Sequence, residues 1–183
     1  MHENLGTDDG ASATLLPINL LDVLVTMAGT GRLGPVSVGA GLDAVTAVLG
    51  APQDLGPTSR RRAWPRRFAY GDLELLVCRC RRVNLFSFPT WRDTIALPAP
   101  SVNGEPFSSP GAPSRANVLA ALDEASCPWE PAPPFTLPGQ STLRVAPTNA
   151  AFTFMDAGHD DFILYSMCLP GDGHGCPPPG TRP

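Results

Sequence analysis

Several features that would assign a functional class directly are missing from this sequence. No phosphate-cradling glycine loop is present, because the glycines of GTGRLG lie between a predicted helix and a short extended segment and do not open a helix. The apolar run 15–28 is shorter than the roughly 20 residues needed to cross a bilayer, and it contains Asp22. The start, MHENLGTDDG, lacks the positive region of a signal peptide. We therefore expect a cytoplasmic protein with no membrane association.

Lysine is absent, since all 13 basic residues are arginine, while alanine, glycine and the 22 prolines are abundant. This composition is typical of GC-rich, actinobacterial coding bias, and we draw no functional conclusion from it. The odd number of cysteines, five, argues against a closed disulfide framework. A chain of 183 residues does not need one, because it can bury roughly 70% of its unfolded surface in a core.

Apolar residues at helical spacing predict three helices. The first follows the repeat from Leu16 to Met27, and the second spans 42–49, where Gly50 and the following proline end it. The third is capped by Ser114 and ends before Cys127.

The stretch 64–88 has the strongest strand-forming character. It predicts an antiparallel meander with turns at Gly71-Asp72 and Arg81-Arg82. Residues 55–63 are expected to form a polar connection into it. The expected strands span 68–70, 73–80, 83–88, 91–97, 143–145, 150–155 and 162–167.

These elements predict an α+β fold in which helices pack on an antiparallel sheet. Each half has the order helix, loop and three strands, which is the order of two tandem units, although two unrelated α+β units can share it by accident. The expected division is a disordered tail at 1–13, helices and meander at 14–97, a proline-rich linker at 98–113, a second helix-plus-strands unit at 114–169, and a disordered tail at 170–183.

The segment VSVGAGLDAVTAVLGAPQD, followed by FAYGDLEL and VNLFSFP, resembles a pattern of the superfamily that includes beta-lactamase inhibitor protein and the SmpA/OmlA small lipoproteins. In that pattern a short strand ending in glycine, here Gly39, leads into a helix that finishes Leu-Gly-x-Pro, here 49–52. The resemblance covers residues 35–90, with a fainter match in 114–168. It implies a sheet face that holds another protein, as in small bacterial immunity proteins, and it transfers no catalytic residues. The sequence lacks the lipidated cysteine of the lipoproteins.

Arginine is concentrated in one region of a chain whose net charge is only −4. The cluster has three interpretations: a solvated feature that discourages sheet aggregation, a docking surface for an anionic protein, or a nucleic-acid surface that combines aromatic stacking with phosphate contacts. The acidic overall charge weighs against the third. The clustered residues are Arg60, Arg61, Arg62, Arg66, Arg67, Arg79, Arg81 and Arg82.

The cysteines predict no metal site. Cys78 and Cys80 are one residue apart, which differs from the two-residue gap of a zinc knuckle. Cys168, His174 and Cys176 could join them, but the glycine- and proline-rich tail gives no sign of an ordered ligand arm. We therefore expect buried or idle thiols, with no metal and no cofactor.

No catalytic residues are predicted either. His159 is flanked by Asp160 and Asp161 in an expected turn, where such residues are common for backbone reasons. Asp72 and Glu74 form the only close carboxylate pair in the meander, and Asp72 is better explained as a hairpin-turn residue that follows Gly71.

The sequence thus favours a non-enzymatic protein-binding module, an immunity-like inhibitor that docks a protein partner through its sheet face and arginine-rich hairpin. One alternative is a nucleic-acid-associated regulator, and a second is an enzyme with an unrecognised Cys/His site. The predicted partner-binding residues are Trp64, Arg66, Arg67, Phe68, Tyr70, Arg79 and Arg81.

Overall fold

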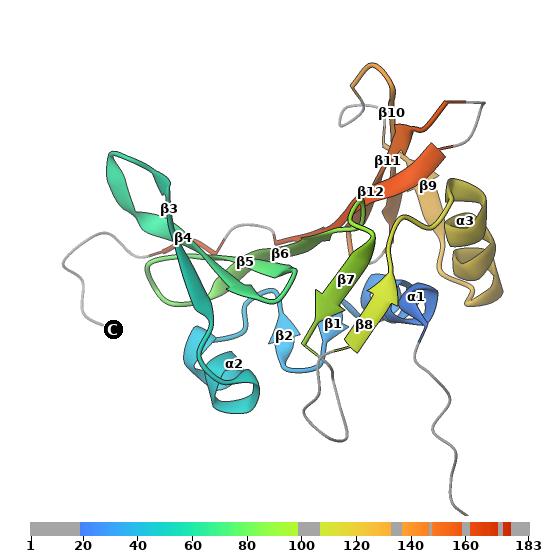
Figure 1. Ribbon diagram of the computed structural model, residues 1–183. Coiled ribbons are helices and arrows are strands. Elements are labelled where there is room, and N and C mark those ends of the chain that lie inside the picture. Colours follow the sequence, from blue (N-terminus) through green and yellow to red (C-terminus); the bar gives the residue numbers. More distant parts are fainter. Residues whose placement is uncertain are drawn as a thin grey trace, which may run out of the picture.

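A single eight-stranded antiparallel sheet dominates the computed structural model, with strand order β3-β4-β5-β6-β12-β11-β10-β9 (Figure 1). The predicted tail at 1–13 lies outside the described residues, as does the part of the predicted linker at 99–106. The described residues are 19–98, 107–132, 137–146, 148–158, 162–171 and 174–176.

The first half of the chain contributes two helices and six strands. They are α1 (Leu20–Thr30), β1 (Arg32–Leu33), β2 (Val36–Ser37), α2 (Leu42–Leu49), β3 (Gln53–Ser59), β4 (Arg62–Tyr70), β5 (Leu73–Val77) and β6 (Val83–Pro89).

The second half begins with a short hairpin. Its elements are β7 (Thr94–Leu97), β8 (Phe107–Pro110), α3 (Arg115–Glu124), β9 (Trp129–Pro131), β10 (Gln140–Val145), β11 (Ala150–Asp156) and β12 (Phe162–Pro170).

Each half contains the same unit of one helix and the strands that follow it. A helix is followed by a four-stranded meander in each, α2 with β3 to β6 and α3 with β9 to β12, and the last strands of the two meanders pair with each other. The α+β prediction with helices on an antiparallel sheet is therefore confirmed. Each meander has one strand more than expected, and the two meanders share one continuous sheet.

The three predicted helices are present. In each of them a backbone N–H of the first turn has a hydrogen-bond acceptor outside the helix. Asn19 accepts a hydrogen bond from the Leu21 N–H at 3.1 Å, and Ser114 caps α3 as predicted. Gly41 has no side chain to cap α2. The Leu42 N–H instead donates to the Arg81 carbonyl at 2.7 Å, so the turn between β5 and β6 supports the start of α2.

Burial alternates along the strands, which gives the sheet one covered and one open face. In β5 and β11 every second residue is buried, and the residues between them are half-exposed. The helices lie on the covered side (Figure 1). The largest fully buried side chains are Phe86, Phe88, Phe152, Phe154, Leu24, Met27, Leu42, Leu73, Leu75, Ile95, Leu97 and Leu122.

Three expectations about where strands begin and end were wrong. The expected connection at 55–63 is the β3–β4 hairpin, whose residues are mostly exposed and include Gly56 and a proline, so no apolar alternation marks it. The predicted strand 73–80 ends at Val77, because residues 78–82 form a turn closed by the Cys78 N–H donating to the Arg82 carbonyl at 2.9 Å. Within the expected linker, 107–110 is β8 and pairs with β7.

Asp72 attaches the β7–β8 hairpin to the sheet and is not merely a turn residue. Its side chain is only 9% exposed, accepts a hydrogen bond from the Ala96 N–H at 2.7 Å and forms an ion pair with Arg92. Its own N–H donates to the Ala96 carbonyl at 2.7 Å. The carboxylate therefore satisfies a β7 backbone donor that lies in a partly buried position.

We predict that Asp72→Ala lowers the free energy of unfolding by about 1–3 kcal/mol, because it leaves the Ala96 N–H and the Arg92 guanidinium without this acceptor. Glu74→Ala is the matched control on the neighbouring strand, where the side chain is half-exposed, and it should change stability by no more than about 0.5 kcal/mol. Urea denaturation measures both, and equal losses in the two variants would contradict the attachment role.

Candidate functional site

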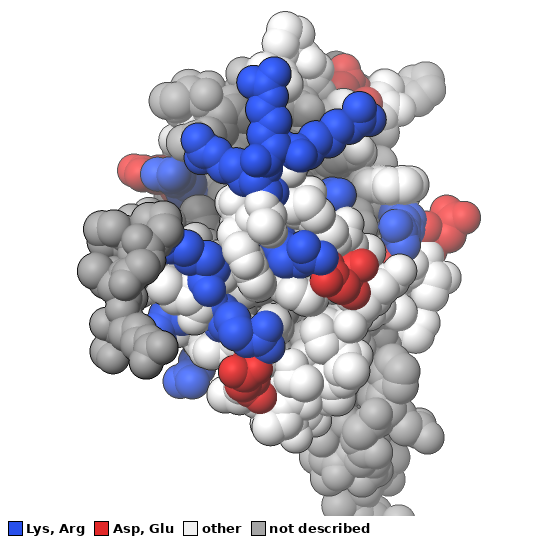
Figure 2. Space-filling view, turned by 90° about the vertical axis from the view of Figure 1, so that its left-hand side faces the viewer, with Lys and Arg blue, Asp and Glu red and all other residues white. Residues whose placement is uncertain are grey.

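Arginines gather on the side of the molecule formed by the β3–β4 hairpin and the turn between β5 and β6 (Figure 2). We call this group the arginine surface. Antiparallel pairing brings the two elements together, since Arg66 in β4 lies opposite Val77, the last residue before the turn. The arginine surface comprises Arg60, Arg61, Arg62, Arg66, Arg67, Arg79, Arg81 and Arg82.

Two of these arginines are held by carboxylates. Arg66 contacts Asp54 of β3 at 2.7 Å, and Arg81 contacts Asp43 at the start of α2 at 2.6 Å. Hydrogen bonding to Arg81 lowers the pKa of the Asp43 carboxyl from its ordinary value of 3.8. The pKa of Asp54 is lowered in the same way, chiefly by the hydrogen bond from Arg66 and then by the Gly56 N–H.

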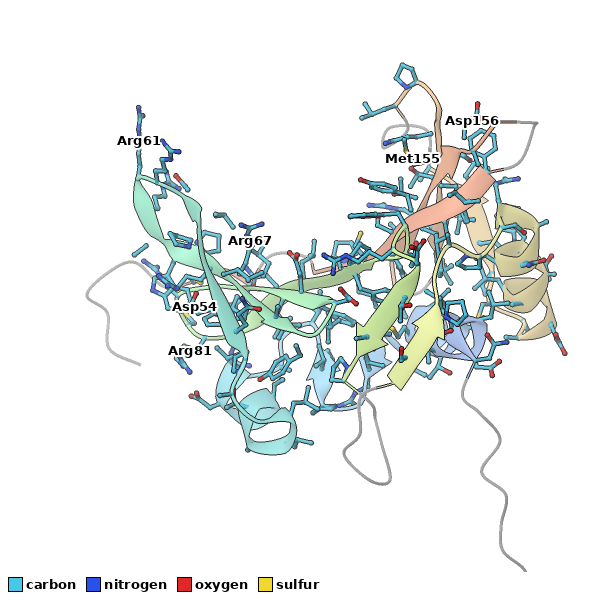
Figure 3. All side chains as sticks on the ribbon, in the orientation of Figure 1. Asp54, Arg61, Arg67, Arg81, Met155 and Asp156 are labelled. Carbon is cyan, nitrogen blue, oxygen red and sulfur yellow. The ribbon has the colours of Figure 1, made fainter. Side chains whose placement is uncertain are left out.

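Four other arginines extend from the β3–β4 hairpin. Arg60, Arg61, Arg62 and Arg67 are exposed, and no described residue forms an ion pair with any of them. Figure 3 shows Arg61 at the far end of the hairpin and Arg67 closer to the body of the sheet. These guanidinium groups are available for an external carboxylate or phosphate.

Two predicted partner-binding residues belong to the core instead. Phe68 and Tyr70 are each 8% exposed, because they lie on the covered face of β4. The Tyr70 hydroxyl donates to the Gly50 carbonyl at 3.1 Å and thereby joins β4 to the end of α2. Their assignment to a partner contact was wrong, since the alternation that exposes Arg67 turns both of them inward.

The remaining predicted residues are accessible to different degrees. Trp64 is half-buried against the core, and the Arg66 guanidinium lies 5.9 Å from its ring centroid. Arg79 donates to the Cys176 carbonyl at 3.1 Å and so holds a distant part of the chain. Arg82, which was not selected from the sequence, donates to the Gly39 carbonyl at 2.9 Å.

The open face of the sheet runs from Arg67 across to β11. Arg67 of β4 pairs with Leu76 of β5. Further across the sheet, Cys168 of β12 pairs with Ser87 of β6 on one side and with Ala151 of β11 on the other. All of these residues are half-exposed or exposed. Figure 3 shows Met155 and Asp156 at the β11 end, opposite the β3–β4 hairpin. The open face comprises Arg67, Glu74, Leu76, Leu85, Ser87, Ala151, Thr153, Met155, Ser166 and Cys168.

Four potential metal ligands meet beside the arginine surface. The ligand atoms of Cys78, Cys80, His174 and Cys176 all lie within 4.8 Å of one another. Cys78 is buried, Cys80 and Cys176 are half-exposed, and His174 is exposed. The expectation that the tail provides no ligand arm was wrong, because 174–176 reaches the turn between β5 and β6.

The thiols of this cluster shift one another's pKa values. Burial raises the pKa of the Cys176 thiol, but hydrogen bonds from Cys78 and Cys80 and the charge of Arg79 outweigh it, so the net pKa is lowered. The hydrogen bond with Cys176 is the main cause of the raised pKa of Cys80. One thiolate can thus be stabilised within the cluster.

Cys168 does not join the cluster. It lies in β12 between Ser87 and Ala151, and burial raises the pKa of its thiol. Of the three residues that the sequence offered as possible additions to Cys78 and Cys80, only His174 and Cys176 lie beside them. The signal that sequence reasoning passed over is the matched spacing, since Cys78 and Cys80, like His174 and Cys176, are separated by one residue.

A shallow hollow beside the β1–β2 hairpin offers no catalytic constellation. Thr30, Ser37 and Thr148 line it, and Arg32 is its only ionisable lining residue. His159 and its neighbouring aspartates lie outside the described residues. None of the described helices is long and apolar enough to cross a membrane.

Comparison with known proteins gives one partial similarity. Human transcription factor 19 is 32% identical over 119 residues, which cover 61% of this chain and 34% of that protein. The chain thus spans about a third of the length of this relative. No family model and no solved structure matches.

We predict that Arg81→Gln returns the pKa of Asp43 toward 3.8, whereas Arg66→Gln returns that of Asp54 only partway, because the Gly56 N–H still donates to Asp54 at 2.8 Å. Since both pKa values are lowered by folding, each pair stabilises the protein above about pH 3.8, and this contribution is lost as pH falls through the folded-state pKa. Carboxyl carbon-13 NMR titration measures both. Unchanged titration in either variant would contradict the pairing.

Proposed function

We propose that this chain is a non-enzymatic, cytoplasmic binding module that docks an acidic protein partner through the arginine surface and the adjoining open face. The observation that carries the proposal is the group of four exposed arginines on the β3–β4 hairpin without described ion-pair partners. Arginine suits such docking because its planar guanidinium forms bidentate hydrogen bonds with carboxylates.

The open face continues this surface with chemistry typical of protein recognition. Leu76, Leu85 and Met155 are half-exposed apolar side chains among small polar ones, and Arg67 lies at the hairpin end of the same face. An interface of apolar contacts bordered by arginine is common between proteins. The resemblance to the superfamily of beta-lactamase inhibitor protein agrees with this arrangement, because its sheet face holds another protein, and it motivates the immunity-like role that we propose.

A protein partner fits the charge pattern better than nucleic acid does. Asp43 and Asp54 lie beside arginines of this surface and neutralise Arg81 and Arg66. Carboxylates at these positions repel a phosphate backbone, whereas a protein surface carries charges of both signs.

Nucleic-acid-associated regulation is the second candidate. It draws on the partial similarity to human transcription factor 19 and on the Arg66 guanidinium beside the Trp64 ring. Stacking of a base on Trp64 with phosphate contacts from the neighbouring arginines would be its mechanism.

We predict that charge reversal at Arg60, Arg61, Arg62 and Arg67 weakens partner binding by at least about tenfold, mainly through slower association. The partner is first captured with the full chain as bait and identified by cross-linking mass spectrometry, which must place its acidic residues against the β3–β4 hairpin. Association and dissociation rates of the purified pair are then measured for the wild type and the variant.

Arg32→Glu is the matched control, because Arg32 is exposed in β1, outside the arginine surface. It should leave the affinity unchanged. Equal affinity of wild type and fourfold variant, or cross-links confined to the helices, would overturn the proposal. Binding of single-stranded DNA whose affinity falls steeply with salt would favour the nucleic-acid candidate.

A further inference from the structure

We propose that Cys78, Cys80, His174 and Cys176 form a structural zinc site that fastens the segment 174–176 to the turn between β5 and β6. Nothing in the docking proposal requires this site, and the two can fail separately. Its basis is the convergence of three thiols and one imidazole from positions almost 100 residues apart in the chain.

The ligand set and its dimensions suit Zn²⁺. Structural zinc is bound by four cysteine or histidine side chains in a tetrahedron, and three cysteines with one histidine is a common combination. Zn–S bonds of about 2.3 Å place tetrahedral ligand atoms roughly 3.7 Å apart. The four ligand atoms here lie within 4.8 Å of one another, so small side-chain adjustments bring them to a common ion. Soft thiolates select zinc over magnesium or calcium.

The backbone turn after β5 positions two of the ligands, Cys78 and Cys80. Cys78 and Cys80 stand in a turn that two hydrogen bonds close, from the Cys78 N–H to the Arg82 carbonyl and from the Arg81 N–H to the Cys78 carbonyl, each at 2.9 Å. Arg81 has a positive φ of 57°, which bends the chain sharply after Cys80. This tight turn directs both thiols to one side, although only one residue separates them.

The second pair of ligands is held by a contact that does not involve sulfur. The Arg79 guanidinium donates to the Cys176 carbonyl at 3.1 Å, and this side chain comes from between the first two cysteines. Such outer contacts orient metal ligands and are typical of zinc sites. His174 completes the set one residue before Gly175, at an exposed position that an ion can enter from solvent.

The surrounding charge also fits the complex. Binding displaces one proton from each of three thiols, while the imidazole binds through its neutral nitrogen, so the Zn²⁺ complex carries one net negative charge. Arg79 lies against the cluster, where its charge acts on the Cys176 thiol. This guanidinium compensates a negative charge that would otherwise be unfavourable beside the buried Cys78.

The test uses the full-length chain purified under reducing conditions without an affinity tag that binds metal. Elemental mass spectrometry should find about one zinc per chain, and native mass spectrometry should assign it to the folded protein. After zinc removal with a chelator, Co²⁺ should produce the intense visible bands of a tetrahedral site with thiolate charge-transfer absorption.

Ligand and control variants locate the site. Cys80→Ser and Cys176→Ser should each weaken zinc affinity by more than the roughly 10–100-fold typical of outer-shell contacts, while circular dichroism shows that the sheet persists. Cys127→Ser and Cys168→Ser remove thiols that lie outside the cluster and should keep one zinc with the cobalt spectrum unchanged.

Three results would overturn the site: no zinc and no cobalt spectrum in the reduced wild type, a bound metal that survives Cys80→Ser and Cys176→Ser unchanged, or iron or copper in place of zinc. A disulfide within the cluster of protein purified under reduction, seen as the loss of two hydrogens in intact mass, would also overturn it. A zinc-loaded chain that binds no acidic partner would contradict the docking proposal alone.

Discussion

Five registered pairs, from Leu85 with Pro170 to Pro89 with Ser166, join β6 to β12 and merge two four-stranded meanders into one sheet. The covered face of each half is thereby completed by the other, since Phe88 lies opposite Met167 and both are buried. These strands are about 80 residues apart, so the pairing must offset a large loop-closure entropy through the apolar area that it buries. A continuous core and a continuous open face both follow from this single contact.

The turn between β5 and β6 links the features proposed here. The Arg81 carbonyl in this turn accepts a hydrogen bond from the first residue of α2. The same turn contains Cys78 and Cys80 and three arginines of the arginine surface. An ion bound to the thiols would fix the backbone from which Arg79 and Arg81 extend. Order at the metal site would then reduce the entropy that these long side chains lose when a partner binds.

Local patterns predicted the helices and the central meander well. The apolar face of 42–49 and the Ser114 cap are short-range signals, and the structure confirms both. The β3–β4 hairpin escaped prediction because it buries little and therefore shows no alternation. Phe68 and Tyr70 were misassigned because one sequence cannot show which strand face the helices cover. The approach of 174–176 to Cys78 depends on tertiary structure, and only the matched one-residue spacing hinted at it.

The two outermost strands of the eight-stranded sheet are poor sites for strand addition. On β3, register shifts flank Gly56 and Pro57, and proline has no N–H to donate, while β9 has three residues and ends in Pro131. Neither strand is a good template for adding a foreign β-strand through backbone hydrogen bonds. A partner of the kind proposed would therefore be recognised by the shape and charge of side chains, and its selection could change in evolution without altering the scaffold.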